Sequence, residues 1–228
     1  MKIAILETGT PPGPLAEIFG RYPDMFRKLL GDDDVGASYD VTRQEFPARP
    51  DHHTAYLVTG SPAGVYDDLP WINPLKDFLL AAKGKAKLIG VCFGHQIMAE
   101  TFGGRVEKSS KGWGVGLQEY QVFEHASWMD EAGWVAVPVS HQDQVVRMPP
   151  ACAVLAGSDF CDMGVLGYQD QPAISFQFHP EFESDYAAAL IEFRRDRLAN
   201  ADAAIASLRQ PNDRQRVAEW IRKFVNAQ

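Results

Sequence analysis

The chain has 228 residues, of which 46% are hydrophobic and 23% are charged, and its net charge is −8. This composition is typical of a folded globular protein and excludes disordered, collagen-like and coiled-coil chains. An acidic chain neutralises few phosphates, which argues against a general nucleic-acid binder and against a protein held on an anionic membrane surface.

The sequence contains no apolar run of the ~20 residues that a membrane helix needs, and its N-terminus lacks the pattern of a signal peptide. The three cysteines, at positions 92, 152 and 161, are too few and too scattered for a disulfide framework. None of them has the Cys/His spacing of a zinc site, so we expect no metal. These features predict a cytoplasmic protein.

The first half of the chain alternates between strand and helix patterns. Strands are expected at 2–8, 39–45, 54–59 and 87–92, and helices at 15–30, 72–82 and 94–102. Pro23 must bend or break the first of these helices. A strand–helix alternation of this kind predicts an α/β fold with a mostly parallel sheet covered on both faces.

The second half contains short strand patterns separated by turns, at 117–123, 134–139, 144–147, 153–156, 164–168 and 173–178. Some antiparallel pairing is therefore expected. Two helices follow, at about 184–208 and 212–226, with Pro211 between them, and the run R-R-D-R at 194–197 is expected to form a solvated helix face. We predict a single domain over 1–228, with a C-terminal helical extension at about 200–228.

A buried strand leads directly into a helix at Cys92, within K-L-I-G-V-C-F-G-H-Q. Gly90 and Gly94 flank the cysteine, which is the pattern of a nucleophile elbow. This tight turn needs small neighbours and pushes the central side chain outward, while the helix N-terminus favours a thiolate over a thiol. We predict that Cys92 is a nucleophile and that Cys152 and Cys161, which lack this context, are structural.

A cysteine nucleophile needs a base, and the base needs a group that orients it. His179 ends an apolar strand, and Glu181 follows it across Pro180, so in an extended backbone both side chains face the same side. We predict that His179 is the base and that Glu181 orients it. His141 is the rival base, with a turn histidine as its alternative interpretation, and His95 is expected to be a packing or capping residue.

Together, G-V-C-F-G-H-Q at 90–96 and H-P-E at 179–181 resemble the class I glutamine amidotransferase family, in particular the glutaminase half of GMP synthase and its free-standing relatives. The resemblance extends over about residues 2–195. It implies a mixed, largely parallel sheet flanked by helices in a flavodoxin-like, three-layer fold. It also implies that Cys92 is the nucleophile, His179 the general base and acid, and Glu181 the orienting carboxylate.

The loop T-G-S-P at 59–62 resembles the oxyanion loop of the same family. The resemblance implies that main-chain amides at Gly60 and Ser61 join the amide of Phe93 in an oxyanion hole. Ser61 stands where the family often has a second glycine, which restricts a flip of this peptide.

Further positions are implied to bind substrate. Gln96 matches a family glutamine that contacts substrate, and K-S-S-K-G-W-G at 108–114, with Gly112 and Trp113, lies where main-chain groups hold the α-amino and α-carboxylate groups. The stretch S-H-Q-D at 140–143 resembles S-H-G-D of GMP synthase-like members, which places His141 in the pocket or against a partner.

The resemblance implies that the chain hydrolyses the side-chain amide of glutamine to glutamate and ammonia through a cysteinyl γ-glutamyl thioester, with no cofactor. The sequence has no phosphate-binding loop, so use of the ammonia would require a separate synthetase subunit. Two alternatives stay open: a free-standing γ-glutamyl peptide or amide hydrolase or transferase with the same triad, and a non-catalytic binding or regulatory module. A homodimer contact through the C-terminal helix also stays open.

Overall fold

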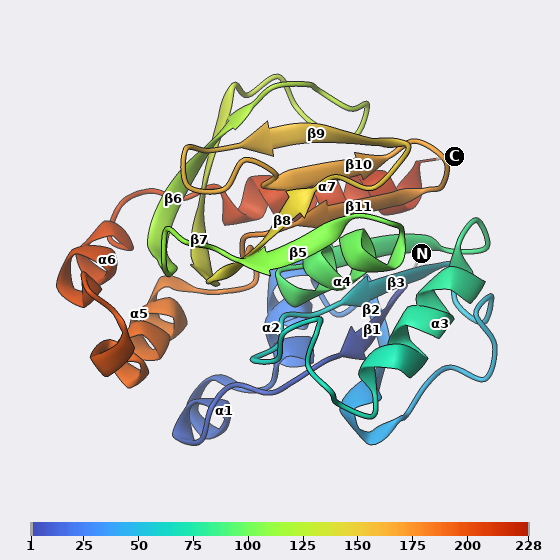
Figure 1. The fold of residues 1–228 in the computed structure, drawn as a ribbon, viewed down its shortest axis with the longest axis horizontal. Coiled ribbons are helices and arrows are strands. Elements are labelled where there is room, and N and C mark those ends of the chain that lie inside the picture. Colours follow the sequence, from blue (N-terminus) through green and yellow to red (C-terminus); the bar gives the residue numbers. More distant parts are fainter. Residues whose placement is uncertain (1, 228) are drawn as a thin grey trace.

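The computed structural model describes residues 2–227. Its centre is a nine-stranded sheet in the order β2-β1-β3-β4-β11-β10-β9-β6-β7, accompanied by a two-stranded sheet of β5 and β8 (Figure 1). The strands are β1 Ile3–Glu7, β2 Val35–Asp40, β3 Ala55–Val58, β4 Lys87–Val91, β5 Arg105–Lys108, β6 Gly114–Val122, β7 Trp134–His141, β8 Asp143–Arg147, β9 Cys152–Gly157, β10 Val165–Tyr168 and β11 Ala173–Phe176. The helices are α1 Pro14–Phe19, α2 Tyr22–Leu30, α3 Ile72–Ala82, α4 Phe93–Thr101, α5 Ser184–Phe193, α6 Ala201–Ser207 and α7 Arg214–Asn226, and two 3-10 turns lie at Val41–Arg43 and Arg195–Arg197.

The main sheet has a parallel part and an antiparallel part. Strands β2, β1, β3, β4 and β11 are paired in parallel. Strands β10, β9, β6 and β7 then continue the sheet by antiparallel pairing. The mixed, largely parallel sheet with flanking helices that the sequence predicts is therefore confirmed, and so is the antiparallel pairing of the second half.

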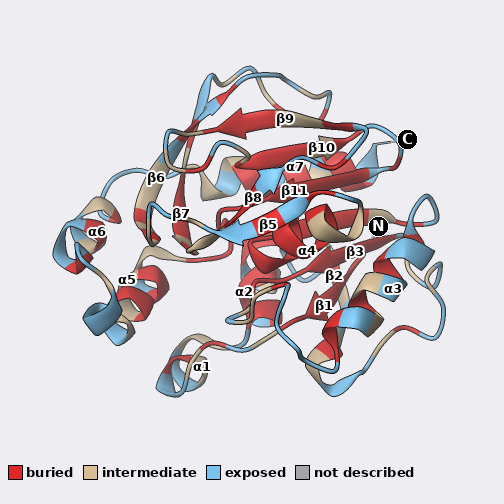
Figure 2. Ribbon diagram, in the orientation of Figure 1, coloured by how far each residue is buried: buried red, intermediate tan, exposed pale blue. Residues whose placement is uncertain are grey.

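Alternate residues of the central strands face opposite helical layers, as the two-residue period of a strand requires. In β1, Ile3 and Ile5 belong to the core shared with α2 and α7. Ala4 and Leu6 belong to the core shared with α3 and α4. The buried strands lie between helices whose outer faces are exposed (Figure 2).

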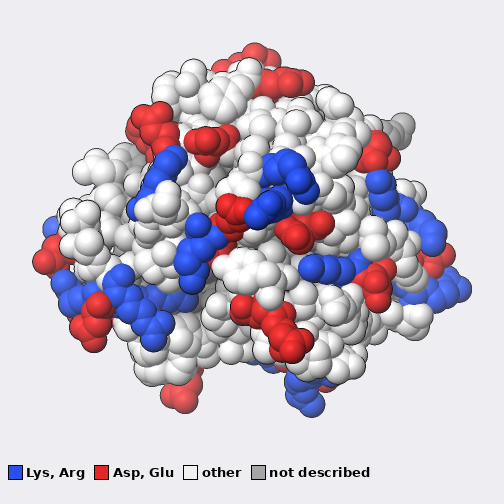
Figure 3. Space-filling model, viewed as in Figure 1, with Lys and Arg blue, Asp and Glu red and all other residues white. Residues whose placement is uncertain are grey.

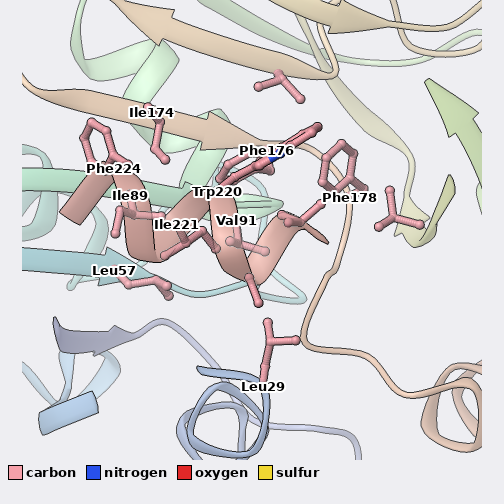
Figure 4. Close-up of a cluster of buried hydrophobic side chains, with 14 of the residues drawn as sticks. Leu29, Leu57, Ile89, Val91, Ile174, Phe176, Phe178, Trp220, Ile221 and Phe224 are labelled. Carbon is pink, nitrogen blue, oxygen red and sulfur yellow. The ribbon is translucent and has the colours of Figure 1, made fainter. Parts of the chain in front are cut away.

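Helix α7 covers one face of the parallel strands. Its side chains Trp220, Ile221 and Phe224 are buried in one cluster with Phe176 of β11 and Val91 of β4 (Figure 4). The last helix thus completes the main core, whereas α6 packs in a smaller cluster with α1, α2 and α5.

Several predicted boundaries were wrong. The helix expected at 15–30 is divided at Gly20, whose φ of +81° ends α1, while Pro23 lies in the first turn of α2, where a missing N–H costs no hydrogen bond. The strand expected at 39–45 lies earlier, at β2, because 35–40 pairs with β1 and the chain then turns. The helix expected at 184–208 is divided into α5, a 3-10 turn and α6, and strand β5 was not predicted.

Within residues 2–227, no helix combines the length and the apolar character that crossing a bilayer requires.

Candidate active site

Cys92 lies at the junction of β4 and α4 with a φ of +52° and a ψ of −102°, a strained conformation for any residue except glycine. Its two glycine neighbours are required by close backbone approach. A Cβ on Gly90 would lie 2.5 Å from the carbonyl oxygen of Gly94, and a Cβ on Gly94 would lie 2.2 Å from that of Val58. The strand, turn and helix therefore hold the sulfur in a fixed position at the carboxyl edge of the sheet.

His179 follows β11 and lies beside this sulfur. Its Nδ1 is 2.7 Å from Oε1 of Glu181, and its ring stacks on Phe182 with centroids 3.8 Å apart and planes 6° from parallel. The side chains of Cys92 and His179 line the same cleft. Because Nδ1 is taken by Glu181, Nε2 is the nitrogen left to face the sulfur.

The electrostatics of this group favour an ion pair. Burial alone would lower the pKa of His179, but the negative charges of Cys92 and Glu181 and their hydrogen bonds outweigh it and raise the pKa to about 10. The imidazole is therefore protonated at neutral pH when the sulfur is a thiolate. A thiolate–imidazolium pair is the activated state of a cysteine nucleophile.

The other two buried histidines have different surroundings. Nδ1 of His141 lies 3.2 Å from the carbonyl oxygen of Asp143, and Nδ1 of His95 lies 2.8 Å from Oγ of Ser175. Burial lowers the pKa of each to about 3, so both are neutral at working pH. Neither forms an ion pair with a carboxylate within residues 2–227, which separates them from His179.

A network of hydroxyl groups holds the loop at 59–62. The carbonyl oxygen of Gly60 accepts hydrogen bonds from Oγ1 of Thr8 at 3.0 Å and from Oγ1 of Thr59 at 3.1 Å, and Oγ of Ser61 donates to the Thr8 carbonyl at 2.6 Å. Because a trans peptide directs its N–H opposite to its C=O, the N–H of Ser61 points away from these hydroxyls. Ser61 thus anchors the loop through its own side chain.

Two main-chain donors belong to residues around Cys92: Ser61 lines the same cleft, and Phe93 follows Cys92 in the chain. Within residues 2–227, the N–H groups of Ser61 and Phe93 have no acceptor, and Phe93 is the first residue of α4, where the helix dipole favours negative charge. Gly60 packs closely against the side chains of His179 and Cys92: a Cβ there would lie 2.9 Å from Cε1 of His179 and 3.7 Å from Cβ of Cys92. Only glycine fits between Cys92, His179 and the loop.

A cleft of about 270 Å³ opens over these groups. Of the residues predicted from sequence, it is lined by Ser61, Cys92, Gln96, Trp113, His141 and His179. Glu181, Gly60 and Phe93 do not line it: Glu181 contacts His179, Gly60 lies against His179 and Cys92, and Phe93 begins α4. Gly112 does not line the cleft; it sits in the turn before Trp113 with a φ of +82°.

Gln96 is held rather than free to rotate. Its Nε2 donates to the carbonyl of Asp143 at 2.8 Å and to Oε1 of Gln177 at 3.1 Å.

The described residues offer no group of three or more His, Cys, Asp or Glu side chains arranged to hold a metal.

The cleft also has walls that the sequence did not predict. They are formed by Tyr22, Tyr66, Asp67, Phe182, Leu190, Arg194 and Arg197. Arg194 and Arg197 belong to the run that was expected to be a solvated helix face; Arg197 is exposed as expected, whereas Arg194 is half-buried against Trp113. Their three-residue spacing, which places side chains on one face of a helical turn, was the only local signal.

The sequence model of the family described as "Glutamine amidotransferase class-I" matches residues 34–195. A glutamine amidotransferase-like protein of Schizosaccharomyces pombe is 29% identical over 85% of this chain and 84% of its own length. Gamma-glutamyl peptidase 2 of Arabidopsis thaliana is 28% identical over 77% of this chain and 74% of its own length. One subunit of the glutamine-hydrolyzing GMP synthase of Methanopyrus kandleri is 34% identical over 44% of this chain and 54% of its own length.

Among solved structures, a glutamine amidotransferase from Thermotoga maritima superposes with a TM-score of 0.76 at 17% identity, covering 100% of both chains. This likeness extends the shared fold to the whole chain. The elbow at Cys92, the mixed sheet and the family match agree, and the resemblance noted in the sequence is confirmed. The chain belongs to the class I glutamine amidotransferase family.

Proposed function

We propose that this protein is an enzyme that hydrolyses the side-chain amide of glutamine to glutamate and ammonia, with Cys92 as nucleophile, His179 as general acid and base, and Glu181 as the carboxylate that orients the histidine. The observation that carries the proposal is the placement of one buried imidazole between a sulfur at a strained elbow and a buried carboxylate. An intact arrangement of this kind favours catalysis over a non-catalytic binding or regulatory module.

In the first half of the proposed reaction, the Cys92 thiolate forms a bond to the γ-carbonyl carbon and the carbonyl electrons move to its oxygen. The N–H groups of Ser61 and Phe93 stabilise this oxyanion; one such donor is typically worth about 2.7–4 kcal/mol. The oxyanion then collapses, the carbon–nitrogen bond breaks, and imidazolium His179 gives its proton to the departing nitrogen. A γ-glutamyl thioester and ammonia result.

In the second half, neutral His179 takes a proton from a water molecule, and the resulting hydroxide attacks the thioester carbon. The carbon–sulfur bond breaks, so Cys92 leaves as a thiolate beside a histidine that is again protonated. Glu181 keeps Nδ1 protonated throughout, which leaves Nε2 to carry the proton in both directions. We propose that Gln96, Trp113 and His141 contact the glutamyl group, because their side chains line the same cleft.

A second candidate substrate is a γ-glutamyl peptide or amide, because only the leaving amine changes in the chemistry above. Two observations favour it. Besides the proposed catalytic groups, the cleft is lined by Leu190, Arg194 and Arg197, which a departing ammonia would not need. A gamma-glutamyl peptidase is also similar to this chain over most of both lengths.

In a third arrangement, the protein is a glutaminase that passes ammonia to a separate synthetase chain. The similarity to one subunit of a GMP synthase supports this arrangement, although that similarity covers less than half of the chain. The glycine-rich stretch at 112–116 leads into strand β6 rather than a helix, so it does not form a phosphate loop. An ATP-dependent partner would therefore have to bring its own nucleotide site.

We also propose a reducing, cytoplasmic location. All three cysteines are free of disulfide bonds, which is typical of proteins in a reducing compartment.

The test is release of glutamate and ammonia by the purified protein from glutamine and from γ-glutamyl dipeptides. We expect the wild-type protein to release glutamate from at least one of these two classes of substrate, and the Cys92→Ala variant to release none. Cys152→Ala is the control and should react at wild-type rates, because its buried thiol lies at the start of β9. Undiminished turnover by Cys92→Ala would remove the proposed nucleophile.

A further inference from the structure

Two arginines on the wall of the cleft have no carboxylate partner within residues 2–227. Arg194 and Arg197 both line the cavity that holds Cys92 and His179. Arg195, between them, faces the other way and pairs with Glu192 at 2.7 Å and Asp202 at 2.9 Å. Lys and Arg side chains gather over α5 and α6 on this side of the molecule (Figure 3). The surface arginine is thus neutralised by its neighbours, and the two cleft arginines are not.

Arg194 is held in place for binding. Its guanidinium carbon lies 5.3 Å from the centre of the Trp113 ring, and Nη1 donates to Oγ of Ser140 at 2.9 Å. Stacking and one hydrogen bond fix the plane of the guanidinium and leave its other N–H groups free. A fixed planar fork of this kind is suited to a carboxylate.

The acidic residues of the cleft are at a different part of its rim and are already engaged. Asp143 accepts a hydrogen bond from Tyr66 Oη at 2.7 Å, and Asp67 accepts one from the Gly64 amide at 2.8 Å. Both contacts belong to the segment that follows the loop at 59–62. The acids that line the cleft are therefore engaged by neutral donors, and neither of them pairs with Arg194 or Arg197.

The position of the arginines relates them to the leaving group. His179 must deliver its proton to the departing nitrogen, so this nitrogen lies on the His179 side of the scissile carbon. The chain continues from His179 through Phe182 and Leu190 to Arg194, and all of these side chains line the cleft. A substituent on the departing nitrogen would extend along this wall towards the arginines.

We propose that Arg194 and Arg197 form a subsite for the carboxylate of the leaving amine, so that the preferred substrates are γ-glutamyl peptides whose second residue has a free α-carboxylate. Phe182 and Leu190 offer apolar surface for the side chain of that residue. The inference rests on the γ-glutamyl chemistry proposed above and names the amine that this chemistry releases.

The test compares γ-glutamyl-leucine with γ-glutamyl-leucinamide, which differ only in that carboxylate, and with glutamine, which releases ammonia. For the wild-type protein we expect kcat/KM for the acid to exceed that for the amide by about tenfold or more, as charge-assisted hydrogen bonds allow. In Arg194→Gln/Arg197→Gln this preference should disappear through a higher KM for the acid. Turnover of the amide and of glutamine should be unchanged in Arg197→Gln, and in the double variant it should fall less than turnover of the acid, because Arg194 also stacks on Trp113.

Arg195→Gln is the matched control, because it removes an arginine from the same turn without touching the cleft. The single variant Arg197→Gln keeps the test valid if the double variant misfolds, since Arg197 has no side-chain hydrogen bond within residues 2–227. It should lose part of the preference for the acid over the amide, and its melting temperature should be unchanged. A wild-type protein that cleaves acid and amide equally would overturn the subsite. An equal loss on all three substrates in the double variant would place the arginines on the glutamyl side and overturn it as well. Absence of glutamate from every substrate would instead contradict the proposed hydrolase activity itself.

Discussion

Nδ1 of His179 lies 2.7 Å from Oε1 of Glu181, across the single residue Pro180. The side chain of Arg214, from the start of α7, secures this bend by donating from Nε to the Pro180 carbonyl at 2.7 Å. Both members of the pair are almost fully buried. The ring is therefore fixed in one tautomer by a contact that is local in sequence and braced from a distant helix.

Glu181→Gln should lower kcat by roughly a hundredfold, because the amide neither fixes the histidine tautomer nor stabilises the imidazolium. The measurement is steady-state hydrolysis of glutamine and γ-glutamyl dipeptides, with the melting temperature as a check on folding. His141→Ala is the comparison, since His141 is the rival base. If His141→Ala does more harm than Glu181→Gln, the assignment of the base is wrong.

The pH profile of kcat/KM should fall on the alkaline side with a midpoint near pH 10, where His179 loses its proton. The thiolate–imidazolium pair exists only below this pKa. In Glu181→Gln, loss of the negative charge that holds the proton lowers the pKa of His179, so the midpoint should move to lower pH. If the alkaline midpoint of kcat/KM does not move in this variant, a group other than His179 determines it.

Cys92→Gly should be more stable than Cys92→Ala by roughly 1 kcal/mol, because glycine adopts a φ of +52° without strain. Both variants should be inactive. Chemical denaturation of the two proteins measures the difference in the free energy of unfolding. Equal stability would mean that the elbow stores no backbone strain at this position.

Thr8→Val should reduce kcat by about tenfold with little change in KM, because it removes a hydroxyl that holds the Gly60 carbonyl and so loosens the Ser61 amide. The effect should be smaller than the loss of an oxyanion donor itself. Thr101→Val is the matched control, since the buried Thr101 hydroxyl has no partner within residues 2–227. Similar rates in both variants would separate the hydroxyl network from catalysis.

Trp220→Ala should destabilise the protein by about 3–5 kcal/mol, as for other large core side chains. We propose that the chain is a single cooperative domain in which α7 is part of the core, so unfolding should remain one transition. Trp134→Ala, at a side chain that is 56% exposed, is the control and should change stability by less than about 0.5 kcal/mol. A separate early transition in Trp220→Ala would show that the C-terminal segment folds independently.

Local patterns account for what the sequence predicts correctly. Gly90 and Gly94 mark the elbow because backbone contacts two residues from Cys92 forbid a side chain. His179 and Glu181 are close in sequence and in space. The alternating apolar residues of β1 and the helical spacing of α4 also carry their own signals.

Contacts between distant segments account for what it does not predict. The Thr8 hydroxyl donates a hydrogen bond to the carbonyl of Gly60, which lies far from it in sequence. Arg194 contacts Trp113 and Ser140 from a later part of the chain. A local pattern contains none of these pairings. Boundaries also shifted where tertiary contacts decided them, as in β2, whose position follows from its register with β1.

The most direct test of the account is the intact mass of the protein after incubation with a glutamine analogue that carries an electrophilic diazoketone at the γ-position. We expect one covalent adduct, mapped to Cys92 by peptide digestion, and none in Cys92→Ala. The labelling rate should fall in Glu181→Gln. An adduct on Cys152 or Cys161, or no adduct on a protein that hydrolyses glutamine, would contradict the central role of Cys92.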